Sequence, residues 1–383
     1  MSGFTRGGSA IIAATTHGLG ASPGFSAMDL AAAASVKALK AIGLKPRDVD
    51  ALFVALPDDA MSGLGLAEYL GVRPKLTDNN RTGGSSFFTH AIHAAVALDA
   101  GECDVALIAY GSNQRSAAGK LISSLRTPAY EAPYRLPRPI GAYAMAANRY
   151  MFQYGATREA FAEVAIAARR WARLNPDAFM RDELTREAYF SARMVADPLS
   201  VRDCCLVTDG AAAVVMTRGD RARDLAARPV YLLGGAAASE HRDIARMSDL
   251  TVTAAVESGA RAFTQARVRP ADIDVLQLYD AFTINVLLFL ENLGFCKKGE
   301  AGDFVAGGRI APGGSLPVNT NGGGLSCTHP GMYGLFTIVE AVEQLTGRAG
   351  ARQVARARLA LAHGNGGELS SQATLVLGNA AAL

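Results

Sequence analysis

The chain has 383 residues, of which 50% are apolar and 19% charged, so it can bury a large core and is not a disordered protein. Its 38 basic residues nearly balance 35 acidic ones, which gives no argument for nucleic-acid binding. Five cysteines without a Cys-x-x-Cys pair speak against structural zinc and a disulfide framework, and favour a reducing compartment. The apolar stretch Ala10–Thr15 is unlike a signal peptide, and no run reaches the ~18 apolar residues of a membrane span. We therefore expect a cytoplasmic protein with no metal site of its own.

A short segment occurs twice. Leu44–Asp50 reads Leu-Lys-Pro-Arg-Asp-Val-Asp and precedes the apolar residues 51–54. Val268–Asp274 reads Val-Arg-Pro-Ala-Asp-Ile-Asp and precedes the apolar residues 275–278. In each copy an Ala-rich amphipathic helix comes first, the proline ends it, and the apolar run enters a sheet.

Each half then repeats the same order of elements. A helix over residues 87–100 leads to a strand over 105–110, and a helix over 336–346 leads to a strand over 357–362. Alternating helices and buried strands predict two duplicated α/β units with mostly parallel sheets. A coincidence is the alternative, because Pro-x-Asp is a common turn, but the matching order of neighbouring elements favours duplication.

A segment of different composition separates the halves. Residues 117–200 are rich in Arg, Tyr, Pro and Met and read as an inserted loop or lid region. The chain returns to the sheet at Thr208–Val215, where Asp-Gly makes a turn and small residues permit close packing. The predicted domains are therefore 1–116 with 201–226, the insertion, and 227–383.

The insertion contains a predicted amphipathic helix over Ala160–Asn175. Its apolar residues lie near one face, and Arg169, Arg170 and Arg173 lie close by. One interpretation is an ordinary helix with a solvated basic face. The other is a lid that contacts coenzyme A through these arginines, because phosphates attract basic side chains.

Several motifs then identify a family. Arg-Leu-Asn-Pro-Asp-Ala at 173–178, Thr-Asp-Gly-Ala-Ala-Ala at 208–213, Asn-Thr-Asn-Gly-Gly-Gly at 319–324 and His-Pro-Gly at 329–331 occur in order along almost the whole chain. Together they resemble the sterol-carrier-protein-X-like branch of the thiolase superfamily. The resemblance implies a five-layered αβαβα fold, a homodimer core and acyl-CoA substrates, with coenzyme A present only as part of the substrate.

The resemblance also locates a missing nucleophile. Counting back from the turn at Gly101–Asp104, the thiolase cysteine position falls on Gly84, which has no side chain to acylate. The neighbouring Ser85 and Ser86 are interpreted as helix-cap residues. The alternative is that one of them serves as a nucleophile, which would need an adjacent base.

The other thiolase positions carry phenols and imidazoles. Tyr279, in Tyr-Asp-Ala-Phe, stands where thiolases have Asn or His, and His329 retains the histidine of the His-Pro loop. His363 stands where thiolases have their acid/base cysteine, and Tyr333 follows the His-Pro loop where a small residue is usual. Each tyrosine could instead be a core aromatic with a bonded hydroxyl, and His363 a histidine satisfied by the glycine loop.

This pattern resembles the cysteine-lacking, steroid side-chain-cleaving aldolases of the superfamily. Those enzymes cleave a β-hydroxyacyl-CoA by a retro-aldol reaction without a covalent acyl-enzyme, and act with a small partner protein that has an OB fold and a zinc ribbon. The resemblance implies that Tyr279 and Tyr333 act as base and acid, in an order the sequence does not give. It extends less directly to His329, as a donor to the thioester oxygen, and to His363, in the place of the acid/base cysteine. Gly84 would leave room for a bulky ketone, or would satisfy a tight turn.

Two other functions stay open on the sequence. One is a thiolase or acyltransferase whose nucleophile has moved to Ser85, Ser86 or Cys327. The other is a non-catalytic acyl-CoA-binding subunit. The chain has no phosphate-binding P-loop and no dinucleotide fingerprint, so neither ATP nor NAD is expected.

Overall fold

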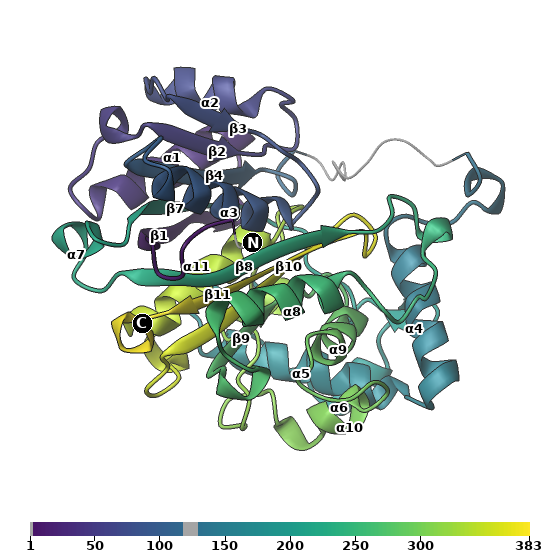
Figure 1. Ribbon diagram of the computed structural model, residues 1–383. Helices are drawn as coiled ribbons and strands as arrows, with labels where there is room; N and C mark the ends of the chain where they lie inside the picture. The colour runs from purple at the N-terminus through teal and green to yellow at the C-terminus, as the bar shows by residue number, and fades with distance from the viewer. Residues whose placement is uncertain (1–2, 118–128) are drawn as a thin grey trace.

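The structure, a computed structural model, describes residues 3–117 and 129–383 and is built around a nine-stranded sheet (Figure 1). Neighbouring strands follow the order β3-β2-β4-β7-β1-β8-β11-β10-β9. Their bounds are β1 Ser9–Gly20, β2 Ala51–Val54, β3 Leu76–Asp78, β4 Val105–Ser112, β7 Asp209–Arg218, β8 Val230–Ser239, β9 Val275–Leu278, β10 Leu359–Gly366 and β11 Ser371–Gly378. A separate hairpin pairs β5 Met194–Ala196 with β6 Leu199–Ser200.

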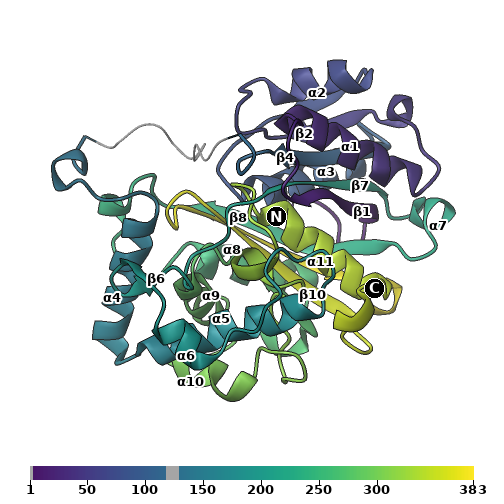
Figure 2. The ribbon, with the colours of Figure 1, turned by 180° about the vertical axis from the view of Figure 1, so that it is seen from behind.

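Helices lie in three layers around this sheet (Figures 1 and 2). Two of them cover the outer face of the first half, two cover the outer face of the second half, and α3 and α11 lie between the halves. The bounds in the described residues are α1 Ala27–Lys40, α2 Ser62–Leu70, α3 Ser86–Asp99, α4 Ile140–Tyr154, α5 Arg158–Arg173, α6 Arg186–Phe190, α7 Ala222–Leu225, α8 Ala255–Ala266, α9 Thr283–Asn292, α10 Ala301–Val305 and α11 Gly334–Thr346. The outer pairs are α1 with α2, and α8 with α9.

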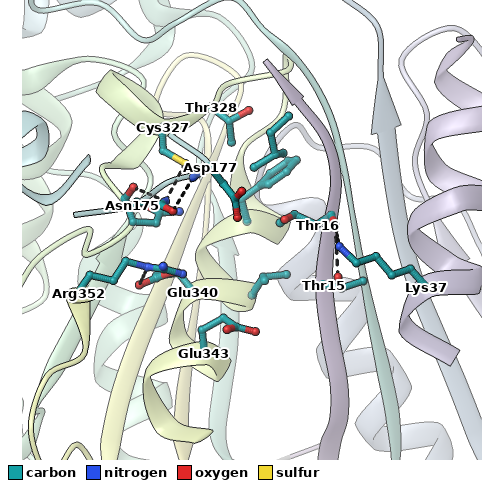
Figure 3. A pocket seen from close by; sticks show the side chains of 14 residues that line it. Thr15, Thr16, Lys37, Asn175, Asp177, Cys327, Thr328, Glu340, Glu343 and Arg352 are labelled. Atoms are coloured by element: carbon teal, nitrogen blue, oxygen red, sulfur yellow. Dashed lines mark hydrogen bonds and ion pairs between the residues drawn. The ribbon is translucent and has the colours of Figure 1, made fainter. Parts of the chain in front are cut away.

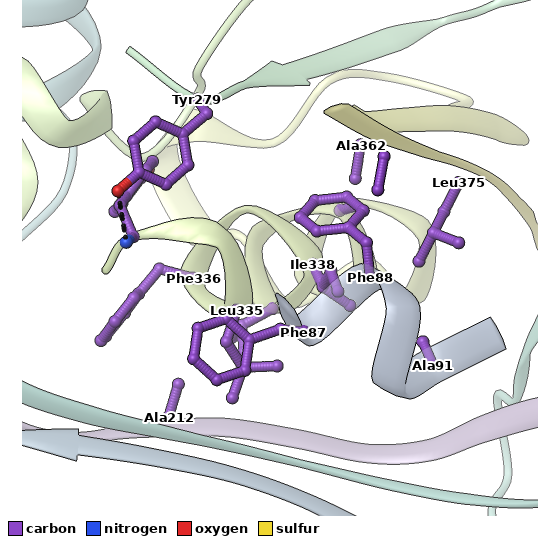
Figure 4. Packing of buried hydrophobic residues seen from close by; sticks show 14 of the residues in the cluster. Phe87, Phe88, Ala91, Ala212, Tyr279, Leu335, Phe336, Ile338, Ala362 and Leu375 are labelled. Atoms are coloured by element: carbon purple, nitrogen blue, oxygen red, sulfur yellow. Dashed lines mark hydrogen bonds between the residues drawn. The ribbon is translucent and has the colours of Figure 1, made fainter. Parts of the chain in front are cut away.

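The nine strands form two sheet halves, and the central helices α3 and α11 pack between them. Strands β1 and β8 pair only at Ala10–Tyr231 and Ile11–Val230. Beyond those pairs α3 and α11 contact strands of both halves. Phe87 and Phe336 are among the buried side chains that fill this layer (Figure 4). The predicted five-layered αβαβα fold is therefore confirmed.

The predicted duplication is visible in the strand order. The first half runs β3-β2-β4-β7-β1, and the second runs β9-β10-β11-β8, with a single parallel bridge at Val318 in the place of β3. The repeated segments also make the same contacts. Asp50 accepts hydrogen bonds from the backbone N–H groups that open β4, and Asp274 accepts the equivalent bonds from Arg358 and Leu359.

One part of the prediction is wrong, because the sheet is mixed rather than mostly parallel. β2 pairs in parallel with β3 and β4, and β9 pairs in parallel with β10. The pairs that β7 makes with β1 and β4, and that β11 makes with β8 and β10, are antiparallel. β7 and β11 read as buried apolar runs because both faces are covered, and such a run looks the same in either direction.

The insertion lies against the second half of the molecule (Figures 1 and 2). Its described part, residues 129–200, forms α4, α5, α6 and the β5–β6 hairpin, while its residues 118–128 lie outside the described residues. α5 begins at Arg158, slightly earlier than predicted, because the Thr157 hydroxyl accepts the Glu159 N–H as a helix cap. Among the described residues no helix is long and apolar enough to cross a membrane.

Candidate active site

Three of the predicted side chains meet where the halves join. Tyr279 directly follows β9, His329 follows a π-helical turn over Gly323–Cys327, and Tyr333 precedes the first turn of α11. The ring centroid of Tyr279 lies 5.6 Å from that of His329 and 5.9 Å from that of Tyr333, and the last two rings are 6.1 Å apart. We call these residues the aromatic cluster. Their exposed fractions are 5%, 7% and 0%, so the cluster is almost dry.

The two phenols are protonated groups in this setting. Tyr279 Oη accepts the backbone N–H of Tyr333 at 3.1 Å, as Figure 4 shows, and Tyr333 Oη donates to Asn321 Oδ1 at 2.9 Å. Burial raises the pKa of both phenols well above the usual value, and for Tyr333 the nearby Asp280 carboxyl raises the pKa further. Near neutral pH each phenol is therefore a hydrogen-bond donor rather than a resting base.

His329 is the complementary group. Burial lowers the pKa of its imidazole to about 4, so the ring is neutral near pH 7. Its Nε2 atom is buried and has no hydrogen-bond partner among the described residues. A buried nitrogen without a partner is costly, so this atom has a hydrogen-bonding capacity that the described residues leave unused.

The nucleophile position is occupied by the ring of Tyr279. A Cβ atom added to Gly84 would lie 1.9 Å from Tyr279 Cε2 and 2.8 Å from the carbonyl oxygen of Asn365. The expectation that Gly84 leaves room for a ketone is therefore wrong, because the phenol fills that room. The turn does not need this glycine for its backbone either, since the left-handed conformation falls on Gly83, with a φ of 95°.

The starts of α3 and α11 abut at this point. A Cβ on Gly334, the first residue of α11, would lie 1.9 Å from the carbonyl oxygen of Gly84. Glycine at position 334 therefore allows the two backbones to approach. This contact brings the turn of one half against the His-Pro loop of the other.

Ser85 and Ser86 do not cap α3 as predicted. Ser85 holds the cap position but its side chain makes no cap bond, and its Oγ donates to Ser371 Oγ at 3.1 Å. Ser86 Oγ accepts the N–H of Thr82, which precedes the helix, at 2.8 Å. Their hydrogen-bond partners in the described residues are hydroxyl and backbone groups, which cannot act as the general base that a serine nucleophile needs.

The prediction for His363 is corrected. Side chains alternate along β10, and a Cβ on Gly364 would meet Phe88 of α3, so the His363 side chain points to the opposite face of the sheet. There its ring packs against Phe289, with centroids 4.5 Å apart. Both ring nitrogens are bonded, Nδ1 to Thr374 and Nε2 to Gln372. His363 is a satisfied core residue outside the aromatic cluster.

The three arginines of α5 divide into two kinds. Arg169 is buried, and its guanidinium donates to Ser326 Oγ at 2.9 Å and to the Asp182 carbonyl at 3.1 Å. These bonds fix the insertion to the π-helical turn, so we no longer expect Arg169 to contact coenzyme A. Arg170 and Arg173 are exposed, and Arg173 forms an ion pair with Glu183. Their contact with coenzyme A stays a prediction.

A cavity of about 210 Å³ lies beside the end of the π-helical turn (Figure 3). Its wall includes Asn321, the acceptor for Tyr333, but neither tyrosine nor His329. Cys327 also lines it, and Asn175 Nδ2 lies 3.5 Å from its Sγ. Burial raises the pKa of the Cys327 thiol far above its usual value, so this thiol is not activated for nucleophilic attack.

Sequence reasoning missed two polar residues at the site. Asp280 is fully buried and accepts the N–H groups of Gly324 at 2.6 Å and Leu325 at 3.4 Å. Asn321 accepts from both Tyr333 Oη and the Gly323 N–H. Both residues lie inside the motifs Tyr-Asp-Ala-Phe and Asn-Thr-Asn-Gly-Gly-Gly. The signal was the presence of polar side chains in otherwise apolar or glycine-rich runs.

Comparison with known proteins agrees with this geometry. Residues 236–379 match the family model described as Thiolase C-terminal domain-like. The chain is 36% identical over 344 residues to 17-hydroxy-3-oxo-4-pregnene-20-carboxyl-CoA lyase of Mycobacterium tuberculosis, covering 85% of this chain and 88% of that one. It is 34% identical over 356 residues to an acetyl-CoA acetyltransferase of Methanothermobacter thermautotrophicus, covering 88% and 91%. A solved structure described as the Ltp2-ChsH2(DUF35) aldolase has a TM-score of 0.88 and 33% identity, covering 97% and 98%.

The chain thus belongs to the thiolase superfamily. Within that superfamily it is a thiolase-like carbon–carbon lyase of the aldolase branch. The two named enzyme relatives are similar in identity, so the site decides between lyase and transferase. Gly84 supplies no thiol, and Tyr279 leaves no space for one.

Buried neutral histidines predict a loss of stability in acid. Burial lowers the pKa of His363 to about 3 and of His90 and His329 to about 4, against an unfolded value of about 6.5. The unfolded chain binds these protons first, so the free energy of unfolding falls as pH drops from about 6.5 toward these values, by about 2 kcal/mol per histidine at pH 5.

The variant His363→Gln isolates one such contribution. Urea unfolding at pH 7.5 and pH 5.0 should show that the wild-type chain loses about 2 kcal/mol more than the variant over that interval. The difference between the two proteins removes the opposite effect of Asp280, whose pKa burial raises to about 7. Equal losses in both proteins would contradict a neutral His363.

Proposed function

We propose that the chain cleaves a β-hydroxyacyl-CoA into a ketone or aldehyde and a shortened acyl-CoA, without an acyl-enzyme. The observation that carries the proposal is the Tyr279 ring in the place of the thiolase nucleophile. A steroid side-chain CoA thioester is the proposed substrate class, since one relative is named for a 17-hydroxy steroid carboxyl-CoA. This extension to steroids rests on similarity of sequence rather than on the site.

The protonation states support an assignment of roles that the sequence left open. His329 Nε2, neutral and unpartnered, takes the proton of the β-hydroxyl as the bond between the α and β carbons breaks. The electron pair of that bond moves to the thioester oxygen as an enolate. Tyr279 Oη, which already accepts one N–H, donates its own proton as a hydrogen bond to that oxygen. This reverses the expectation that His329 is the donor and a tyrosine the base.

The remaining steps need no water. The α-carbon of the enolate takes a proton from the cluster, which restores the thioester. The proton that His329 took from the β-hydroxyl replaces the one that the cluster gave up. Tyr333, bonded to Asn321, keeps the loop that carries His329 next to Tyr279 and can share this proton. A dry cluster favours these steps because water would compete for the enolate and weaken each hydrogen bond.

We further propose that the chain works as a homodimer with an OB-fold, zinc-ribbon partner. The support for a partner is the solved relative, whose description joins Ltp2 to ChsH2(DUF35) in an aldolase. The homodimer rests on the resemblance to thiolases. The exposed Arg170 and Arg173 are proposed to meet the phosphates of the CoA thioester.

The test uses the chain co-purified with its partner and a small panel of β-hydroxyacyl-CoA esters. Product analysis should find equal amounts of ketone and shortened acyl-CoA, and the intact mass of the chain should be unchanged after turnover. A stable acyl adduct on Ser85, Ser86 or Cys327 would instead support a transferase. Binding of the esters without products would support a non-catalytic subunit.

A further inference from the structure

A buried carboxylate lies directly beside the aromatic cluster without belonging to it. Asp280 follows Tyr279 in the chain and is fully buried. Its Oδ1 accepts the Gly324 N–H at 2.6 Å, and its Oδ2 lies 3.4 Å from the Leu325 nitrogen. These N–H groups belong to the first residues of the π-helical turn, where backbone donors lack partners within the turn. Asp280 therefore satisfies the start of that turn.

Asp280 lies so close to the π-helical turn that a residue larger than glycine does not fit at position 323. Gly323 has a φ of 66°, and a Cβ there would lie 1.9 Å from Asp280 Oδ2. A Cβ on Gly324 would lie 3.0 Å from His329 Cδ2. That Cβ would also lie 3.2 Å from Asp280 Oδ1, so the small glycines let both the carboxylate and the His329 ring pack against the turn.

The same turn reaches Tyr333 through one amide. Asn321 Oδ1 accepts the Gly323 N–H at 2.8 Å and the Tyr333 hydroxyl at 2.9 Å. A shift of Gly323 would therefore move the acceptor of the Tyr333 proton. At its other end the turn leads to His329, whose backbone N–H donates to Thr208 Oγ1.

We propose that Asp280 is a positioning residue for the aldol reaction, which fixes the turn of residues 323–327 and through it the partners of Tyr333 and His329. Only the kinetic part of this inference rests on the proposed function. Asp280 itself does not contact the substrate in this proposal.

Asp280 acts on the aromatic cluster through its charge as well as through its hydrogen bonds. Burial raises the pKa of this carboxyl to about 7, and its negative charge helps to keep the Tyr333 phenol protonated. The titratable groups around it in the described residues are Tyr333 at the start of α11, Cys327 on the turn, Cys205 on the loop before β7, and His329, which packs against the same glycine of the turn. Burial keeps all four neutral near pH 7, so ionisation of Asp280 is the charge change that the cluster senses there.

The test compares Asp280→Asn with the wild-type chain. Asparagine keeps the volume and one acceptor for Gly324 but removes the charge. With tyrosines labelled at ¹³Cζ, the Tyr333 signal, assigned by its absence in Tyr333→Phe, should shift with an inflection near pH 7 in the wild-type chain and none in Asp280→Asn. This readout needs no turnover, so it stays valid if the proposed function fails.

The kinetic arm uses the assembled complex. Asp280→Asn should lower kcat by at least tenfold and remove any bend of the pH–rate profile near pH 7. Asp203→Asn is the matched control, because Asp203 is an equally buried carboxylate that accepts from Ser200 and Thr283. It should lower the unfolding midpoint but leave the pH dependence and the Tyr333 signal unchanged.

Two outcomes would overturn the inference. An unchanged Tyr333 inflection in Asp280→Asn would show that another group is sensed. A uniform loss of rate at every pH, equal to that of Asp203→Asn, would show that Asp280 supports the fold alone. If the complex shows no aldolase activity but the Tyr333 signal behaves as expected, the proposed function fails and the coupling of Asp280 to Tyr333 stands.

Discussion

Tyr279→Phe is expected to lower kcat for retro-aldol cleavage by about 100- to 1000-fold, the usual effect of removing one donor to a developing oxyanion. The phenyl ring would stay beside Gly84, so the shape of the site should be kept. The lost hydroxyl also leaves the Tyr333 N–H without its acceptor, which costs about 1–3 kcal/mol of stability. The measurement is single-turnover kinetics of the assembled complex together with urea unfolding.

A matched control separates the two effects. Tyr150 is another buried tyrosine, whose hydroxyl donates to the carboxylate of Glu291 and whose ring, in the described part of the chain, makes no ring contact with the aromatic cluster. Tyr150→Phe should lose stability to a similar degree while kcat changes less than threefold. If Tyr279→Phe retains more than a tenth of the wild-type kcat, the hydroxyl does not stabilise the enolate and the proposed roles fail.

Gly84→Cys, which restores the thiolase residue, is expected to inactivate the enzyme rather than to create a thiolase. The new Cβ would overlap Tyr279 Cε2 at 1.9 Å and press on the Asn365 carbonyl. Overpacking of this kind costs about 1–3 kcal/mol or more, and it would push the phenol out of the cluster. Thermal unfolding and the cleavage assay should both show the loss.

A double-mutant cycle tests whether the overlap with Tyr279 causes the loss of stability in Gly84→Cys. Tyr279→Ala removes the overlapping ring, so Gly84→Cys should be much less destabilising in that background than in the wild-type chain. Gly302→Ala is the matched control, because its Cβ would meet only Ala160 at an ordinary 3.4 Å and should leave stability nearly unchanged. Additive effects at positions 84 and 279 would show that the two side chains do not compete for one space.

The repeated parts of the fold could be predicted from the sequence. Pro46 and Pro270 open equivalent short helical turns, and Asp50 and Asp274 make equivalent backbone contacts, so a local pattern reported a local structure. Strand direction could not be predicted. A buried strand such as β7 has apolar residues on both faces, and its sequence does not record which way it runs.

Site residues could be predicted where a sequence motif fixes the backbone. They could not be predicted where a contact joins segments that are far apart in the sequence. His329 and Tyr333 follow one glycine-rich loop and were found together. His363 was misplaced because side chains alternate along a strand, so an error of one position moves a residue to the other face of the sheet. The fit of Tyr279 over Gly84 joins residues from different halves, and no pattern in either segment contains it.

The abutting starts of α3 and α11 have a consequence for how the two halves tolerate change. The two helices hold equivalent places in the two halves of the strand order. A side chain at Gly84 would meet Tyr279 and Asn365 of the second half, and one at Gly334 would meet the Gly84 carbonyl of the first. Neither half can therefore accept a larger residue at this junction unless the opposite half moves.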